Sequence, residues 1–248
     1  MNACARVVAA GDDRGGTRLI SLRSAAPLLV RPTSRGVYLV GGAAGPIGGD
    51  RLRLEIDLGT AARLTVRTAA SSVALPGQSG EASTLHVEAA VGDGGSLRWL
   101  PEPAVAAACC HHRSTARVSV GTGGRLLWRE ELILGRHGEQ PGAFTSRLSI
   151  DVAGAPLLRQ ELSVGPGHPG WDGPAVAGSS RAVGSVVVVD PRWVDSPPPR
   201  PTAPLGEQAA VLALSGPAVQ VVALADDAVA LRRLLDAGVD SFLDENGR

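Results

Sequence analysis

The chain has 248 residues, no lysine, and 24 arginines that balance 24 acidic residues, so its formal net charge is zero. A neutral chain gives no electrostatic reason to expect nucleic acid or an anionic membrane as a partner, and the lack of lysine excludes lysine-dependent chemistry. Three cysteines, two of them adjacent, do not form a disulfide framework, and no uncharged run is long enough to span a membrane. We therefore expect a cytoplasmic protein.

The dominant sequence period is two residues, which is the period of a β-strand with one buried face. Arg51–Leu58 alternates charged and apolar residues without a fault, and Arg63–Arg67 alternates again after the turn Gly59–Ala62. We therefore expect these two segments to form a hairpin. Similar strand–turn–strand patterns surround the turns Gly92–Gly95, Gly121–Gly124 and Ala153–Pro156. Together they predict a mainly β fold, a large single domain of stacked antiparallel sheets with few helices.

One segment near the C-terminus has a helical pattern. Asp226 and Asp227 stand where N-capping residues are preferred, and Gly238 stands where a helix would stop. The predicted apolar stripe consists of Val229, Leu231, Leu234 and Leu235. The proline-rich segment 196–204 is expected to be an extended connector to this C-terminal helical segment, and residues 1–248 are interpreted as one domain.

The glycine-rich stretch Gly41–Asp50 invites a phosphate-binding interpretation, which its details do not support. A Walker loop needs a lysine after its last glycine, and a dinucleotide fingerprint opens a helix. Here the stretch opens the alternating strand that begins at Arg51. We interpret it as a close backbone crossing or a bulge, where Cβ atoms would not fit.

Three segments, in this order, resemble the urease accessory protein UreD (UreH) family. They are GGAAGPIGGDRLRLEIDLGTAARLTVRTAASSVALPG from Gly41, WLPEPAV from Trp99 and LLWREELILGRHGEQPGAF from Leu126. The resemblance runs from Tyr38 to Val164. The chain departs from the family's pattern at Val73 and Leu75, where the family usually has a lysine and an aromatic residue, and in the segment Ala106–His112.

The resemblance implies a cytoplasmic scaffold without catalytic activity of its own. Such proteins bind urease apoprotein together with a helical accessory protein of the UreF type and a nickel-carrying GTPase of the UreG type. Nickel passes through that assembly to the urease active site, so nickel is cargo in transit and no cofactor is permanently bound. The family fold is a large β structure of stacked sheets with few helices.

The run Cys109, Cys110, His111 and His112 combines thiol and imidazole groups, which suit late first-row metals such as nickel. In a strand, Cys109 and His111 share one face while Cys110 and His112 share the other, so neither face supplies the three or four ligands of a stable site. Two interpretations stay open: metal contact, or small buried thiols beside exposed histidines. A metal site here would also allow an alternative function, that of a β-rich metal-dependent enzyme. A further alternative for the chain as a whole is a β-sandwich interaction module.

Charged residues in three places are candidates for an ion path or an interface. They are Asp50, Glu130, Glu131, Arg136 and Glu139. Glu130 and Glu131 are neighbours in one strand, so one of them is expected to point inward, where a carboxylate needs a partner or water. Either these groups line a hydrated ion path, or Arg136 forms a salt bridge that fixes a turn. The chain has neither a Gly-x-Ser-x-Gly nor a His-Glu-x-x-His motif, so no enzyme is expected.

Overall fold

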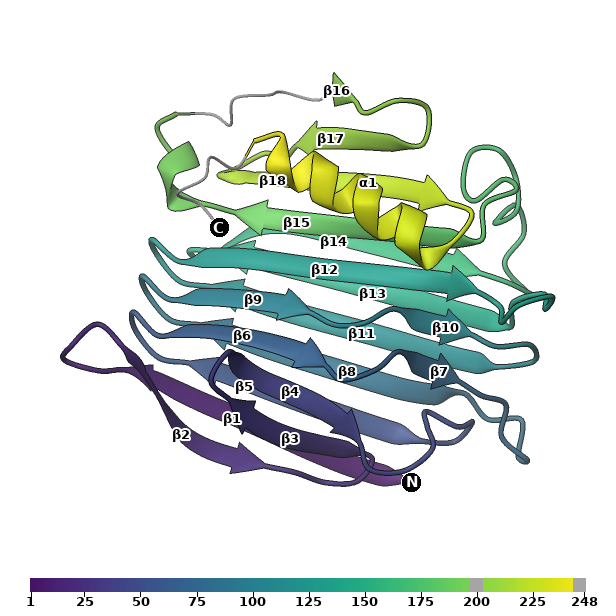
Figure 1. Cartoon of the computed structure of the whole chain (residues 1–248), viewed down its shortest axis with the longest axis horizontal. Helices are drawn as coiled ribbons and strands as arrows, with labels where there is room; N and C mark the ends of the chain where they lie inside the picture. Colours follow the sequence, from purple (N-terminus) through teal and green to yellow (C-terminus); the bar gives the residue numbers. More distant parts are fainter. Residues whose placement is uncertain (197–202, 243–248) are drawn as a thin grey trace.

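Alternating apolar side chains build two β-sheets that face each other across a common core (Figure 1). The computed structural model describes residues 1–196 and 203–242. The seven-stranded rear sheet has the order β14 (Ala155–Val164), β13 (Ala143–Val152), β11 (His111–Val120), β8 (Ser83–Val91), β5 (Arg51–Leu58), β1 (Asn2–Gly11) and β2 (Thr17–Arg23).

The eleven-stranded front sheet lies over it and carries the only α-helix in the described residues. Its order is β16 (Ala203–Pro204), β17 (Ala209–Ala213), β18 (Ala218–Ala225), β15 (Ala182–Val189), β12 (Arg125–Leu134), β9 (Ser96–Leu100), β6 (Arg63–Thr68), β4 (Gly36–Gly41) and β3 (Leu28–Thr33). The short strands β7 (Ser72–Ala74) and β10 (Ala104–Ala106) pair with each other, and β10 also pairs with β12. A 3-10 turn, η1, spans Pro191–Trp193.

The prediction of a mainly β fold of stacked sheets with a helix near the C-terminus is confirmed, but the predicted antiparallel pairing is wrong in the centre of both sheets. Strands β1, β5, β8, β11 and β13 pair in parallel, as do β4, β6, β9 and β12. In the rear sheet antiparallel pairs occur only at the two edges, for example β13 with β14. In the front sheet they join β3 to β4 and also connect β12 in series to β15, β18, β17 and β16. The alternation of apolar and polar residues shows that one face of a strand is buried. Parallel and antiparallel strands can both have one buried face, so the alternation could not distinguish the two kinds of pairing.

The predicted hairpin of Arg51–Leu58 with Arg63–Arg67 is also wrong, because these strands lie in different sheets. At Gly59 the chain crosses from β5 in the rear sheet to β6 in the front sheet, and it repeats this crossing between β8 and β9 and between β11 and β12. The crossings stack, since Gly92 N donates to Leu58 O and Gly121 N donates to Val91 O, both at 2.7 Å. The chain thus coils, and each turn of the coil adds a strand to both sheets.

The glycine-rich stretch is a close backbone crossing, as predicted. A Cβ atom on Gly48 would lie 2.5 Å from Gly77 N, and one on Gly77 would lie 2.3 Å from Gly48 O. No side chain fits between these two backbone segments. The crossing fixes the start of β5 beside the loop that follows β7.

Helix α1 (Ala228–Asp240) begins where the sequence predicts, because Asp227 accepts hydrogen bonds from Val229 N and Ala230 N, both at 2.8 Å. Leu231 and Leu235 are fully buried against β15 and β18. The assignment of Val229 to the buried stripe is wrong, since its side chain is 60% exposed. Gly238 does not stop the helix; it lies inside it and allows Val221 to approach. Most of the predicted connector lies outside the described residues.

Within the described residues, no helix is both long enough and apolar enough to cross a membrane.

Candidate functional site

A cavity of about 1010 Å³ lies between the two sheets. Apolar side chains of the inner faces form most of its wall, among them Leu54, Val87 and Leu148. Its lining continues to the loop Ala43–Pro46 and to the segment 207–210. The cavity therefore extends between two distant parts of the chain.

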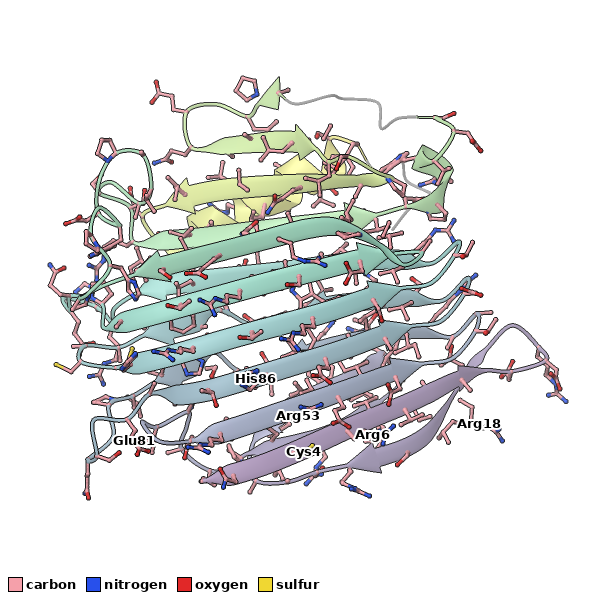
Figure 2. All side chains as sticks on the ribbon, turned by 180° about the vertical axis from the view of Figure 1, so that it is seen from behind. Cys4, Arg6, Arg18, Arg53, Glu81 and His86 are labelled. Carbon is pink, nitrogen blue, oxygen red and sulfur yellow. The ribbon has the colours of Figure 1, made fainter. Side chains whose placement is uncertain are left out.

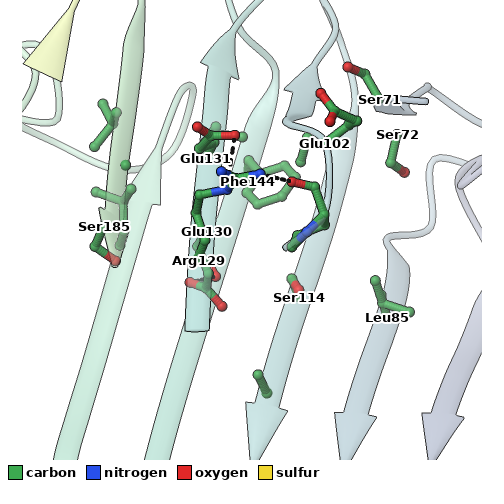
Figure 3. Close-up of a pocket in the computed structure, with 18 of the residues that line it drawn as sticks. Ser71, Ser72, Leu85, Glu102, Ser114, Arg129, Glu130, Glu131, Phe144 and Ser185 are labelled. Atoms are coloured by element: carbon green, nitrogen blue, oxygen red, sulfur yellow. Dashed lines mark hydrogen bonds and ion pairs between the residues drawn. The ribbon is translucent and has the colours of Figure 1, made fainter. Parts of the chain in front are cut away.

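Polar side chains interrupt this apolar wall. The register puts Ser114 on β11 beside Ser146 on β13, and Glu130 on β12 beside Ser185 on β15. These residues line the cavity together with His112, Gln160 and Gln220. Figure 3 shows Ser114, Glu130 and Ser185 in this wall. The amide groups of Gln220 and Gln160 are hydrogen-bonded to each other across the two sheets. The cavity wall thus contains hydroxyl, amide, imidazole and carboxyl groups.

Glu130 is the inward-pointing member of the Glu130–Glu131 pair. Its carboxyl group accepts hydrogen bonds from Trp128 Nε1 and from Ser146 Oγ on the opposite sheet, both at 3.2 Å. No arginine or histidine forms an ion pair with it in the part of the chain that the structure describes. Burial raises the pKa of Glu130, and the two hydrogen bonds only partly oppose this shift. Burial therefore favours the neutral, protonated form of the Glu130 carboxyl group more than exposure to water would.

Glu131 points to the outer side of the front sheet and belongs to an ion-pair cluster. Arg232 on α1 contacts both oxygens of Glu131 and also binds Glu102, with a closest distance of 3.0 Å for the second pair. Arg129 lies 3.7 Å from Glu131, and its Nη2 donates to Pro101 O at 3.3 Å (Figure 3). Burial lowers the pKa of Arg129 despite the charge of Glu131. The cluster borders the cavity lining where the chain leaves β9 and enters β10.

The Cys109–His112 run is divided between two environments. Cys109 and His111 are exposed, while Cys110 and His112 are only 2% and 3% exposed. This division has Cys109 with His111 and Cys110 with His112, as the two faces of a strand would, and it differs from the interpretation of two buried thiols beside two exposed histidines. The structure instead buries one thiol and one imidazole.

The buried pair of this run is held in place by local contacts. His112 Nδ1 is hydrogen-bonded to Ser83 Oγ at 2.8 Å, and its ring lies 4.9 Å from that of Phe144. Burial lowers the pKa of His112 to about 4, so the imidazole is neutral at pH 7. Burial raises the pKa of the Cys110 thiol to about 11. His112 is thus the member of the run that presents a neutral nitrogen ligand to the cavity.

Arg136 and Glu139 form a salt bridge with each other at 2.6 Å. Glu139 also accepts a hydrogen bond from Ala108 N at 3.2 Å, so it ties its own loop to the turn that contains Cys109. The hydrogen bond from the Arg136 side chain contributes most to lowering the pKa of Glu139 to about 2. This geometry favours the interpretation in which the salt bridge fixes a turn.

Asp50 closes the glycine-rich stretch and is 5% exposed. It accepts hydrogen bonds from Ile47 N at 2.9 Å and from the Met1 ammonium group at 2.7 Å. Burial opposes ionisation, but these two donors outweigh it, so the pKa of Asp50 is lowered. Through these contacts Asp50 stabilises the loop that precedes β5.

In residues 1–196 and 203–242, no three His, Cys, Asp or Glu side chains converge as a metal site would require. The structure brings Glu130 and His112 to one cavity, and it places Asp50 and the Arg136–Glu139 pair in turns. The sequence interpretation missed Ser114, Ser146, Gln160, Gln220 and Arg232. Four of these are polar residues at positions that the alternation assigns to the buried face, which is a signal that could have identified them.

Two facing sheets of mixed parallel and antiparallel strands, around a cavity with a partly polar wall, define a class of large β proteins. The model of the UreD urease accessory protein family matches residues 1–245, and the chain belongs to this family. It is 45% identical to the urease accessory protein UreD of Streptomyces avermitilis, with 98% of both chains covered. It is 46% identical to UreD of Streptomyces coelicolor, with 98% of this chain and 97% of the relative covered.

Proposed function

We propose that this chain is a scaffold for assembly of the nickel centre of urease. It binds urease apoprotein together with a helical accessory protein of the UreF type and a nickel-carrying GTPase of the UreG type. It works in the cytoplasm and has no catalytic activity of its own. Membership of the UreD family and relatives named urease accessory proteins support this role.

The cavity between the sheets is the hydrated route by which nickel crosses the scaffold. The observation that carries this step is Glu130, a buried carboxyl group held only by the neutral donors of Trp128 and Ser146. A carboxyl group without a basic partner is free to compensate the charge of a passing cation, whereas one paired with arginine is not. Weak oxygen and nitrogen contacts along the wall suit transfer, because a cation that binds too tightly does not leave.

The charge at Glu130 is balanced by exchange of one proton with the water of the route. When the cation arrives, a protonated Glu130 carboxyl group transfers its proton to this water, and the carboxylate contacts the hydrated ion. When the ion moves on, the carboxylate takes a proton back from the water. His112, which is neutral at pH 7, offers a second contact in the same cavity without changing its protonation.

No observation supports the alternative function, that of a metal-dependent enzyme. It uses the Cys109–His112 cluster with Cys109 and His111 in its site, and no group of three His, Cys, Asp or Glu side chains that could hold a metal ion occurs in the described residues.

Deletion and complementation in the native urease-producing cell test the function. We expect the deletion strain to accumulate urease protein without nickel, measured by metal analysis of the purified enzyme. Nickel-loaded, active urease in that strain would overturn the proposed function.

Complementation with E130Q tests the route, because glutamine keeps the shape of the side chain but cannot become an anion. We expect the assembly to form and the nickel content of urease to fall at least about fivefold. The matched control is E88Q, since Glu88 lies on the outer face of the rear sheet in a pair with Arg53. Equal nickel content with E130Q and E88Q would show that the ion does not depend on Glu130.

A further inference from the structure

The part of the front sheet that α1 leaves uncovered carries arginines that form no ion pair with an acidic side chain of residues 1–196 and 203–242. Helix α1 contacts β15, β17 and β18 and only the nearest part of β12, so β3, β4, β6 and β9 present their outer side to solvent (Figure 1). None of the residues in these four strands is acidic. Their four arginines, here called the basic strip, are Arg31, Arg63, Arg67 and Arg98.

The register gathers the basic strip on one face. Arg31 pairs with Tyr38 and Tyr38 pairs with Arg67, so these three side chains form one row across β3, β4 and β6. Thr65 pairs with Arg98 in the next row, which makes Arg67 and Arg98 diagonal neighbours on the same side. The alternate residues of these strands, such as Val66 and Leu97, lie in the core. The arginines therefore face outward together.

Arg98 lacks the partners that a half-buried guanidinium group needs. Its Nε atom is buried and has no hydrogen-bond partner in the described residues. Burial and the nearby charge of Arg67 both lower the pKa of Arg98. An unpaired, partly desolvated cation is costly, and a carboxylate from outside would remove that cost.

The outer face of the rear sheet shows the contrasting arrangement in the same molecule (Figure 2). There Arg6 pairs with Asp57 at 2.7 Å, and Arg53 pairs with Glu88 at 2.6 Å. Further along, Arg147 pairs with Glu161 at 2.5 Å. These three arginines of the rear face are neutralised by acidic side chains of neighbouring strands, whereas no acidic side chain of the described residues pairs with an arginine of the basic strip.

We propose that the basic strip is the docking surface for a partner protein that presents a cluster of Asp and Glu side chains. This inference rests on the proposed function, in which the chain binds other proteins of the urease assembly. Guanidinium groups bind carboxylates in a bidentate geometry, and arginine and tyrosine are enriched at the energetic centres of protein interfaces. Nucleic acid is the less fitting occupant, because the chain is neutral overall and the strip has only four cations.

The test measures binding of the full-length chain to purified urease apoprotein and to the purified UreF-type protein, by calorimetry at two salt concentrations. We expect R67Q/R98Q to weaken binding to one of these proteins at least about tenfold and to reduce its salt dependence. The matched control is R53Q/R147Q on the rear face, which should bind like the wild type. The melting temperature of R67Q/R98Q should stay equal or rise, because two like charges without partners are removed.

The outcomes separate the inference from the proposed function. Equal binding by R67Q/R98Q and the wild type would overturn the basic strip as a docking surface and leave the function standing. A wild-type chain that binds neither protein would overturn the proposed function and the inference with it. A 20-base-pair DNA duplex is the remaining probe, and binding of this DNA that is lost in R67Q/R98Q would overturn a protein partner.

Discussion

Arg232 on α1 donates to both carboxylate oxygens of Glu131 on β12, across a sequence separation of 101 residues. The side chain of Glu131 is only 1% exposed, so this contact supplies the charge that a buried carboxylate needs. The contact also ties the C-terminal helix to the strand that carries Glu130 on its inner side. The position of α1 and the wall of the cavity are therefore coupled through one strand.

The first prediction is that R232A destabilises the protein by about 3 kcal/mol, because removing one partner leaves a buried charge with only Arg129 nearby. Chemical denaturation followed by circular dichroism measures the change. R233A is the matched control, since Arg233 is the exposed next residue of the same helix. A stability loss as large in R233A as in R232A would contradict the role of the Glu131 contact.

The second prediction concerns pH and His112. The pKa of His112 is about 4 in the folded chain and about 6.5 when unfolded, so the unfolded chain binds more protons between these values. Stability should therefore fall as pH decreases through this window, with a loss of about 2 kcal/mol between pH 7.5 and pH 5.

Denaturation of H112Q and H111Q at both pH values isolates this contribution. H112Q should lose less stability than the wild type on acidification, by about 2 kcal/mol, because it lacks the group that takes up the extra proton. H111Q should follow the wild type, since His111 is exposed. An identical pH dependence in H112Q and the wild type would show that another group carries the effect.

The third prediction is that G48A costs at least about 2 kcal/mol, because its Cβ atom would meet backbone atoms of Gly77, which no rotamer change can move. G41A is the control in the same glycine-rich stretch. The nearest atom to a Cβ on Gly41 is 3.8 Å away, so its cost should stay below about 1 kcal/mol. Thermal melting of both variants gives the comparison, and similar melting temperatures would contradict the backbone crossing.

The fourth prediction is that two of the three thiols react in the native protein. Cys4 and Cys109 are exposed, whereas Cys110 is buried and its pKa is raised to about 11, so little thiolate is present. Titration with a disulfide reagent should count two thiols in buffer and three in denaturant. C110A should keep the native count at two, and a lower native count in C110A would mean that Cys110 is accessible.

The positions of strands such as β5 and β8 were predictable because each carries its own alternation, and the helix cap at Asp227 was predictable for a similarly local reason. The partners of strands were not, since the order β1, β5, β8, β11 and β13 depends on where the chain crosses between sheets. For the same reason Glu130 and Glu131 could be recognised as neighbours on opposite faces, but neither Ser146 nor Arg232 could be assigned to them. Those contacts join segments that are far apart in sequence and have no shared motif.

Because the chain follows a coiled path, the width and the length of the space between the sheets are set by different features. Its width is the spacing of facing sheets, about 10 Å, which side-chain packing keeps nearly constant. Its length is set by how many turns of the coil are stacked, since every turn, such as β8 followed by β9, extends both walls by one strand. Because each turn contacts only its neighbours, a duplicated or deleted turn would lengthen or shorten the molecule without changing its cross-section. The distance between the two ends of the molecule therefore changes only in whole steps, one turn of the coil at a time.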